Sequence, residues 1–493
     1  MIQRCPLFIN GEFKDSVNAN QIINPATSEI IAEVAVAGED DVNLAIASAR
    51  NCYDKVWSKV SLKERREFLI KICLGIMDKA SELAKLETLN TGKPIKESTF
   101  MDIPTSAKTF EYFANNLEEY LNEQELALDN AEGRLVRSGR GVVVLIVPWN
   151  YPLIIASWKM AQALAAGNSV ILKPSSLTPL TALELGKIIQ ESGLPAGTVN
   201  IITGSGESIG EALCSGKNVD MISFTGSNSV GKKIIEYCSG NVKKLIMELG
   251  GKSAGIVLKD ADFETAVNGC LCSIFLNQGQ MCTAMSRILV EDDIYDKFIE
   301  DFVNKAKRIN IGNGLDYQTQ MGPLISKQQR DSVMGFVERA KKQGAKLVCG
   351  GKVPDSSELK KGFFFEPTIF TQVPIDAEIF KEEIFAPVAC VNKFSSIDEA
   401  IEIANKSDFA LAGAIWTKDI PRAEKIAFCI NAGTVWINTY GMFYNELPYG
   451  GFKQSGFGKE LGREGFLEYT LLKNIITDKS PDSKPLVNYW YGF

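Results

Sequence analysis

Histidine is absent from this 493-residue sequence. Ser-His-Asp catalysis, Cys-His catalysis and HExxH zinc sites all depend on an imidazole, so these classes of active site are excluded. A cysteine nucleophile in this chain would have to be activated by a carboxylate, a helix N-terminus or a bound cation.

Long apolar runs and an excess of positive charge are also missing. No run approaches the roughly eighteen apolar residues of a membrane-spanning helix, so we expect no membrane partner. The formal net charge is −7, which argues against nucleic acid as a partner because phosphate binding needs a basic face. The opening stretch MIQRCPLFINGEF has neither a long apolar core nor a small-residue cleavage site, so we expect no secretory signal.

Cysteine, by contrast, is well represented, with eleven residues. Without a secretory signal, we interpret them as free thiols of a cytoplasmic protein rather than as a disulfide framework. Cys270 and Cys272 fall on a mostly apolar helical stretch, where core packing would explain them. CxC is not a usual zinc spacing, and histidine is absent, so we expect no metal site.

The length predicts two or three domains. Residues 40 to 123 have a helical pattern with a stop signal at Thr91-Gly92, and we expect no reactive constellation there. From Gly141 onward, short β-branched runs alternate with helical runs, which predicts βαβ units and a parallel sheet. The alternation resumes after Lys252, with a helix expected from residue 263 to 277, and predicts a second α/β domain.

Two further segments have a strand-like pattern. Residues 121–140 are polar and then basic, which fits either a projecting β arm or a solvated hairpin or linker. The tail from Glu468, EYTLLKNIITDKS and then PLVNYWYGF, is strand-like and aromatic. It is a candidate for oligomer contact by edge pairing, although it could equally pack on its own subunit.

Polar residues gather where the strands of the first α/β region end, and ligands of parallel sheets bind at such ends. Phe224 ends a strand that opens directly into a helix through Thr225-Gly226-Ser227, an arrangement that favours a pyrophosphate at the helix N-terminus. The spaced glycines Gly206 and Gly210 are weaker signals, because most such patterns are ordinary turns. Lys173, the last residue of SVILK, would bind ribose hydroxyls or a phosphate, or else lie on the surface.

Three residues would supply acyl-transfer chemistry. Cys282 follows a Gly-Gln pair in NQGQMCTAMSR, and Glu248 closes an apolar strand before ELGGKS, where a charge is costly unless it has a task. A thiol nucleophile and a carboxylate base with a raised pKa suit covalent catalysis. The side-chain amide of Asn150 in PWNYP would stabilise an oxyanion, or else is a turn asparagine.

Taken together, these segments resemble the aldehyde dehydrogenase superfamily over nearly the whole chain. The matching motifs, in order, are PWNYP, ALAAGNSVILKPSS, GLPAGTVNI, FTGSNSVGKKI, MELGGKS, NQGQMCTAMSR, MGPLIS, EEIFAPV and GGFKQSGFGKELGREG. The resemblance implies an α/β protein with a Rossmann-type NAD(P)-binding domain, an α/β catalytic domain and a small β oligomerisation arm. The expected boundaries are 1–120 and 140–250 for the first, 251–446 for the second, and 121–139 with 467–493 for the arm. A homodimer or homotetramer is implied.

The resemblance also implies a set of site residues. Cys282 matches the nucleophile, Glu248 the general base, Asn150 and the Cys282 backbone N–H the oxyanion hole, and Lys159 with Glu460 a proton-relaying pair. Tyr151, Trp158 and Tyr449 match residues that line the aldehyde tunnel. The implied cofactor contacts are Ile146, Pro148, Trp149, Lys173, Ser176, Gly206, Gly210, Phe224, Ser227, Val230, Leu249, Glu383 and Phe385.

The implied reaction is oxidation of an aldehyde to its carboxylic acid with NAD or NADP, through a Cys282 thioester hydrolysed by Glu248-activated water. Many relatives have KPSE where this chain has KPSS, so Ser176 removes a glutamate that repels a 2′-phosphate and we expect NADP to be accepted. Aromatic tunnel residues and the terminal NYWYGF resemble the betaine- and aminoaldehyde branch. Alternatives are aliphatic or aromatic aldehydes, succinic semialdehyde, transfer of the thioester to coenzyme A, or a catalytically silent nucleotide-binding relative.

Overall fold

A computed structural model describes residues 2–480 and 487–491. Its first large sheet has eight strands, β22 (Gly456–Phe457), β12 (Lys244–Glu248), β11 (Met221–Thr225), β8 (Val142–Ile146), β9 (Ser169–Lys173), β10 (Val199–Ile201), β2 (Leu7–Ile9) and β3 (Glu12–Lys14), in that order. The strands from β12 to β10 are parallel, whereas β22, β2 and β3 join antiparallel.

Helices cover both faces of this sheet, as expected for a parallel sheet with fully buried strands. Alternate residues of β8 point to opposite faces: Val142 and Val144 belong to one apolar cluster, and Val143 and Leu145 to another. The helices of this part of the chain are α1 (Glu39–Lys55), α2 (Leu62–Asp78), α3 (Ala80–Thr91), α4 (Ile95–Glu97), α5 (Ile103–Tyr120), α6 (Pro152–Ala165), α7 (Leu180–Glu191), α8 (Glu211–Ser215) and α9 (Asn228–Cys238).

The strand order reverses at β8, which lies between β9 and β11. In open α/β sheets a crevice forms at such a switch point, outside the carboxyl ends of the strands. The segments that follow β8 and β11 therefore border a natural ligand site. The predicted helix stop is also in place, because α3 ends at Thr91 and Gly92 takes a left-handed conformation with φ 83°.

The second large sheet has seven strands, β15 (Lys346–Cys349), β16 (Thr368–Thr371), β17 (Val388–Phe394), β14 (Arg287–Glu291), β13 (Ala254–Val257), β19 (Ala412–Trp416) and β20 (Thr434–Ile437), in that order. All neighbours are parallel except β15 and β16. Its helices are α10 (Phe263–Phe275), α11 (Tyr295–Ala306), α12 (Lys327–Lys342), α13 (Glu378–Lys381), α14 (Ile397–Asn405) and α15 (Ile420–Cys429).

The chain links the two large sheets after β20. Strand β21 (Phe452–Lys453) pairs with β18 (Phe409–Ala410) beside the second sheet, and β22 then joins the edge of the first sheet at β12. Helix α16 (Gly462–Glu468) follows. A small separate sheet near the N-terminus contains β1 (Gln3–Cys5), β5 (Ile30–Ala35) and β4 (Ala19–Ile23).

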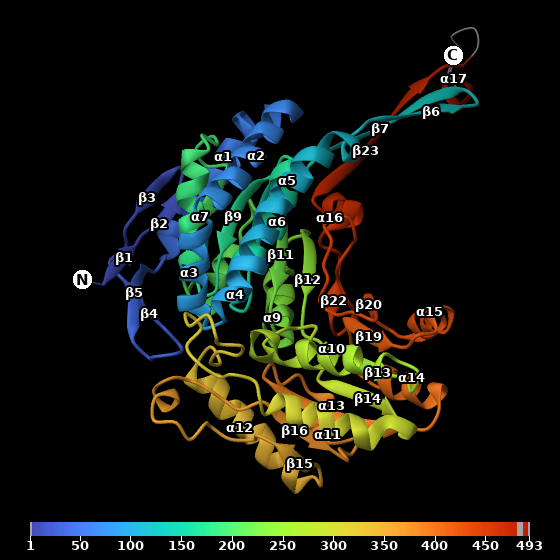
Figure 1. Ribbon diagram of the computed structural model, residues 1–493. Coiled ribbons are helices and arrows are strands. Elements are labelled where there is room, and N and C mark those ends of the chain that lie inside the picture. The colour runs from blue at the N-terminus through green and yellow to red at the C-terminus, as the bar shows by residue number, and fades with distance from the viewer. Residues whose placement is uncertain (1, 481–486, 492–493) are drawn as a thin grey trace.

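A three-stranded antiparallel sheet projects from the body of the molecule (Figure 1). It consists of β6 (Gln124–Leu128), β7 (Ala131–Gly139) and β23 (Thr470–Asp478). Residues 487–491 form a short helix, α17 (Val487–Tyr491), so the strand expected there is wrong. Residues 481–486 and 492–493 of the predicted arm lie outside the described residues. The predicted domain boundaries stay a prediction.

Within the described residues, no helix combines the length and apolar character that crossing a membrane requires. The structure has all eleven cysteines as free thiols.

Candidate active site

Cys282 lies on a tightly turned loop between α10 and β14. We expected a helix as far as Asn277, but α10 ends at Phe275 and the chain turns through three consecutive left-handed residues, Asn277 (φ 44°), Gln278 (φ 57°) and Gly279 (φ 68°). The second glycine of ELGGKS permits a close approach to this loop. A Cβ atom on Gly251 would lie 2.2 Å from the carbonyl oxygen of Cys282, so only glycine fits there.

The Cys282 side chain borders two cavities of about 330 and 760 Å³. Thr225, Leu249 and Cys282 line both. The Cys282 Sγ lies 3.3 Å from the hydroxyl of Tyr449. Burial raises the pKa of the Cys282 thiol to about 12, and nearby Glu383 and Glu248 add to the rise. The thiol is therefore protonated at neutral pH in the absence of a ligand.

Glu248 ends β12, the apolar strand that the sequence predicted it to close, and its side chain lines the smaller cavity. The residue is 3% exposed, and neither carboxylate oxygen has a hydrogen-bond partner among the described residues. Burial and the charge of Glu460 raise its pKa well above the usual range, while Lys159 and Lys459 oppose the rise. A buried, unpaired carboxyl that borders a cavity is suited to accept and release a proton.

Lys159 and Glu460, which line the same cavity, form a buried ion pair with Nζ and Oε1 2.6 Å apart. The hydroxyl of Ser223 donates to the same Glu460 oxygen over 2.7 Å, and Gln162 Nε2 donates to the other over 2.8 Å. The hydroxyl of Tyr469 lies 3.2 Å from both oxygens. Sequence reasoning missed these three partners, although a polar Ser223 inside an otherwise apolar strand was a usable signal.

Asn150 follows β8 and contacts the nucleophile loop. Its side-chain Nδ2 donates to the carbonyl of Gln280 over 2.9 Å, and its own carbonyl accepts from Nδ2 of Asn277 over 3.0 Å. Asn150 is 6% exposed, and it lines the larger cavity together with Cys282. The structure thus places Asn150 and Cys282 on the lining of one cavity.

The larger cavity lies at the switch point of the first sheet. Every residue predicted to contact the cofactor lines it: Ile146, Pro148, Trp149, Lys173, Ser176, Gly206, Gly210, Phe224, Ser227, Val230, Leu249, Glu383 and Phe385. Helix α9 begins at this cavity. Among the described residues, Ser227, which precedes the helix, makes no side-chain capping bond. A helix N-terminus beside buried Lys173 fits a dinucleotide pyrophosphate. Burial lowers the pKa of Lys173 to about 8.

At the end of this cavity near Cys282, a second loop is held in place. Phe385 is left-handed (φ 58°), and its ring packs edge-on against Trp149 with centroids 5.1 Å apart. Gln329 Nε2 donates to the carbonyls of residues 384 and 385. Glu383 accepts the backbone N–H of Gly251 over 3.0 Å, and burial raises its pKa to about 7.

The smaller cavity has a wall of aromatic rings. Tyr151, Trp158 and Tyr449, which the sequence predicted, all line it, and so do Phe443 and Tyr440, which sequence reasoning missed. The rings of Trp158, Phe443 and Tyr449 contact one another, with centroid separations of 5.4 to 5.8 Å. Such a cluster can bind an apolar group or, through its ring faces, a cation.

Comparison with known proteins agrees with this geometry. The model of the family described as aldehyde dehydrogenase matches residues 13–475. The chain is 46% identical over 490 residues to a betaine aldehyde dehydrogenase of Bacillus subtilis (strain 168), with 99% of both chains covered. It is 40% identical over 487 residues to a peroxisomal aminoaldehyde dehydrogenase 2 of Malus domestica, covering 97% of this chain and 96% of the relative.

A solved structure is similarly close. The crystal structure of a betaine aldehyde dehydrogenase from Staphylococcus aureus in complex with NAD+ matches with a TM-score of 0.95 at 40% identity, covering 98% of this chain and 96% of that chain. These matches confirm the fold class that the motifs predicted.

Proposed function

The chain belongs to the aldehyde dehydrogenase family, and from this premise we propose that it oxidises an aldehyde to the carboxylic acid with Cys282 as nucleophile and NAD(P)+ as oxidant. The observation that carries the proposal is the position of Cys282 on the shared wall of the two cavities. One cavity fits an aldehyde and the other fits a dinucleotide.

Each residue of the site has a defined task in this reaction. The Cys282 thiol loses its proton to water, and the resulting thiolate attacks the aldehyde carbon. The carbonyl oxygen becomes an oxyanion that the Asn150 amide and the Cys282 backbone N–H stabilise. Bound NAD(P)+ accepts hydride and so leaves a thioester on Cys282. Glu248 then takes a proton from water, which attacks the thioester and releases the acid. Lys159 and Glu460 would pass that proton onward.

Both cofactors fit the cleft under this proposal. Ser176 stands where many relatives have glutamate, and a serine does not repel the 2′-phosphate of NADP. Lys173 and Lys233 line the same cleft and add positive charge. A preference for NAD over NADP of a hundredfold in kcat/KM would contradict this part of the proposal.

A betaine- or amino-type aldehyde is the proposed substrate class. The contacting rings of Trp158, Phe443 and Tyr449 offer a site for a quaternary or primary ammonium group. Hexanal turned over as well as betaine aldehyde would favour the alternative of aliphatic or aromatic aldehydes. Among the described lining residues, the one cation is Lys159, which is already paired with Glu460, so the carboxylate of succinic semialdehyde lacks a partner.

Two other functions receive less support. Transfer of the thioester to coenzyme A does not need a water-activating base, yet Glu248 is present and buried beside the cavity. A silent nucleotide-binding relative would not need Cys282, Glu248 and Asn150 together. Formation of free acid without added coenzyme A distinguishes the proposed reaction from both.

We also propose that the arm joins subunits into a homodimer or homotetramer, and that the protein works in the cytoplasm. The support for assembly is apolar side chains that are 40–65% exposed on β23, at Leu471, Leu472, Ile475 and Ile476. The support for the compartment is the eleven free thiols.

The central experiment compares Cys282→Ser with Cys429→Ser, the same substitution at an exposed thiol. A panel of aldehydes is assayed with each cofactor by absorbance of the reduced nicotinamide. We expect Cys282→Ser to lose at least about a thousandfold in kcat and Cys429→Ser to match the parent. Parent-like oxidation by Cys282→Ser would refute the proposal.

A further inference from the structure

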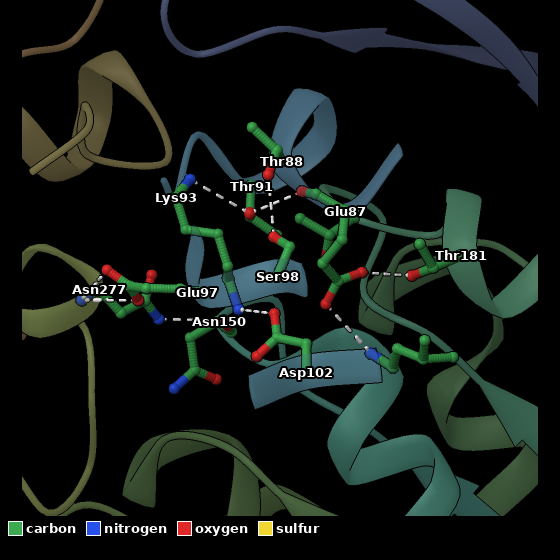
Figure 2. Close-up of polar contacts among 12 residues, drawn as sticks. Glu87, Thr88, Thr91, Lys93, Glu97, Ser98, Asp102, Asn150, Thr181 and Asn277 are labelled. Atoms are coloured by element: carbon green, nitrogen blue, oxygen red, sulfur yellow. Dashed lines mark hydrogen bonds and ion pairs between the residues drawn. The ribbon is translucent and has the colours of Figure 1, made fainter. Parts of the chain in front are cut away.

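A group of ionisable side chains, three of them buried and one half-buried, contacts the nucleophile loop, in a part of the chain where we expected no reactive constellation (Figure 2). It contains Glu87 of α3, Lys93, Glu97 of α4 and Asp102. Lys93 and Asp102 are both 0% exposed, with Nζ and Oδ2 2.7 Å apart. One lysine faces three carboxyls, so desolvation and mutual repulsion raise the pKa of Glu87 to about 7 and of Glu97 to about 8.

Glu97 connects this group to the active site. Its carboxylate accepts the backbone N–H of Asn277, with N···O distances of 3.1 and 3.3 Å. The side-chain Nδ2 of Asn277 donates to the carbonyl of Asn150, and the side chain of Asn150 donates to the carbonyl of Gln280. Figure 2 shows Glu97, Asn277 and Asn150 in sequence along this path.

The nucleophile loop has a backbone conformation that needs a stabilising hydrogen bond from outside the loop. Asn277 and Gln278 hold left-handed backbone conformations that side-chain-bearing residues rarely adopt. The Glu97 carboxylate bonds to the first residue of this left-handed run, where the chain leaves α10. Without that bond, the loop has less to oppose relaxation toward ordinary backbone angles.

The same group also contacts the other side of the site. The Glu87 carboxylate accepts the backbone N–H of Leu153 at 3.4 Å and the hydroxyl of Thr181 at 2.7 Å. Lys93 Nζ lies 4.1 Å from the centre of the Tyr151 ring. Glu97 directly precedes a π-helical turn, Ser98–Asp102, and Asp102 is its last residue; such a distortion is often found at functional sites. The segment from 87 to 102 thus contacts both the start of α6, just after Asn150, and the Cys282 loop.

We propose that Glu97 is a positioning residue for the reaction, because it holds the Asn150 amide beside Cys282 through Asn277. The inference rests on the proposed function, since it assumes that the Asn150 amide stabilises an oxyanion. Glu97 is not among the described residues that line either cavity, so its hydrogen bond to the loop is the contact through which we expect it to act.

Two reactions of Cys282 separate positioning of the amide from general damage. Acylation by 4-nitrophenyl acetate forms an oxyanion, whereas alkylation by iodoacetamide does not. In Glu97→Ala we expect kcat for aldehyde oxidation and the rate of acylation to fall together by about tenfold to a hundredfold. Alkylation, the KM for aldehyde and the Kd for NAD(P)+ are expected to stay within about threefold. Glu97→Gln keeps an acceptor oxygen and should recover most of the loss.

The matched control is Glu118→Ala, which removes an exposed carboxylate from α5 and should match the parent. Asn277→Gly tests the link if Glu97→Ala does not fold, because glycine tolerates the left-handed backbone and lacks the Nδ2 donor to the carbonyls of Asn150 and Gln280. We expect it to show the same difference between acylation and alkylation. The double variant should be no worse than Asn277→Gly alone, because both changes break one path.

Three results would overturn the inference: parent-like acylation in Glu97→Ala or Asn277→Gly, an equal fall in acylation and alkylation, or fully multiplicative losses in the double variant. The acylation rates of Cys282→Ser and Asn150→Ala show whether the proposed function or only the role of Glu97 has failed. If Cys282→Ser still acylates, the proposed function itself is wrong. If both lose acylation while Glu97→Ala retains it, only the role of Glu97 is wrong.

Discussion

Replacing Trp158 by leucine should selectively weaken the oxidation of cationic aldehydes. Trp158 is 5% exposed, and its ring contacts those of Phe443 and Tyr449 at 5.6 and 5.8 Å between centroids. A desolvated cation–π contact with tryptophan contributes about 2 kcal/mol, which corresponds to roughly thirtyfold in affinity. Leucine keeps the wall apolar but removes the ring face, so the cation loses more than a neutral group of the same shape.

The assay compares betaine aldehyde with 3,3-dimethylbutanal, in which carbon replaces the quaternary nitrogen. The ratio of their kcat/KM values cancels general damage to the site. We expect this ratio to fall by about tenfold to thirtyfold in Trp158→Leu, and to stay unchanged in Trp490→Leu, where the ring is 76% exposed outside the cavity. The reasoning fails if the ratio moves by less than about threefold, or if the neutral aldehyde loses more.

Three other perturbations have defined outcomes. Ser176→Glu should lower kcat/KM for NADP by at least about tenfold and leave kcat/KM for NAD unchanged, because the negative charge of the new carboxylate repels the 2′-phosphate. Steady-state kinetics with both cofactors measure this, and an equal fall for NADP and NAD would contradict it. The pKa of Cys282 is raised to about 12 and that of Glu248 well above its usual range. Both groups must lose a proton to act, so alkylation of Cys282 in the ligand-free enzyme and kcat should rise with pH from 6 to 9; a profile that falls over this range would contradict the assignment. Changing Leu472 and Ile476, which are 54% and 65% exposed on one face of β23, to aspartate should reduce the mass measured by sedimentation while circular dichroism stays native, and an unchanged mass would rule out this face as the contact.

The parallel sheets were predictable because their strands are short apolar β-branched runs separated by helical periodicity. Positions at strand ends, such as Glu248 and Phe224, followed from that alternation without any knowledge of distant contacts. The family motifs then supplied the resemblance, and the match to residues 13–475 confirms it. The roles of individual site residues stay predictions, although the structure places them around two adjoining cavities.

Features that depend on tertiary contacts were not predictable. Strand β22 joins β12 from more than two hundred positions away along the chain, and no local pattern encodes that pairing. Asn277 was expected to end the helical run that begins at Phe263, but its bonds to Glu97 and Asn150 stabilise a left-handed turn instead. In the sequence Glu97 and Lys93 look like ordinary surface charges, yet neighbouring segments bury Lys93 completely and half-bury Glu97.

The two cavities have only Thr225, Leu249 and Cys282 in common among the described lining residues. Selectivity for the oxidisable compound and selectivity for its electron acceptor therefore depend on almost entirely different residues. Natural variation or directed evolution can therefore change one selectivity by substitutions that leave the other unchanged, as long as Cys282 is kept.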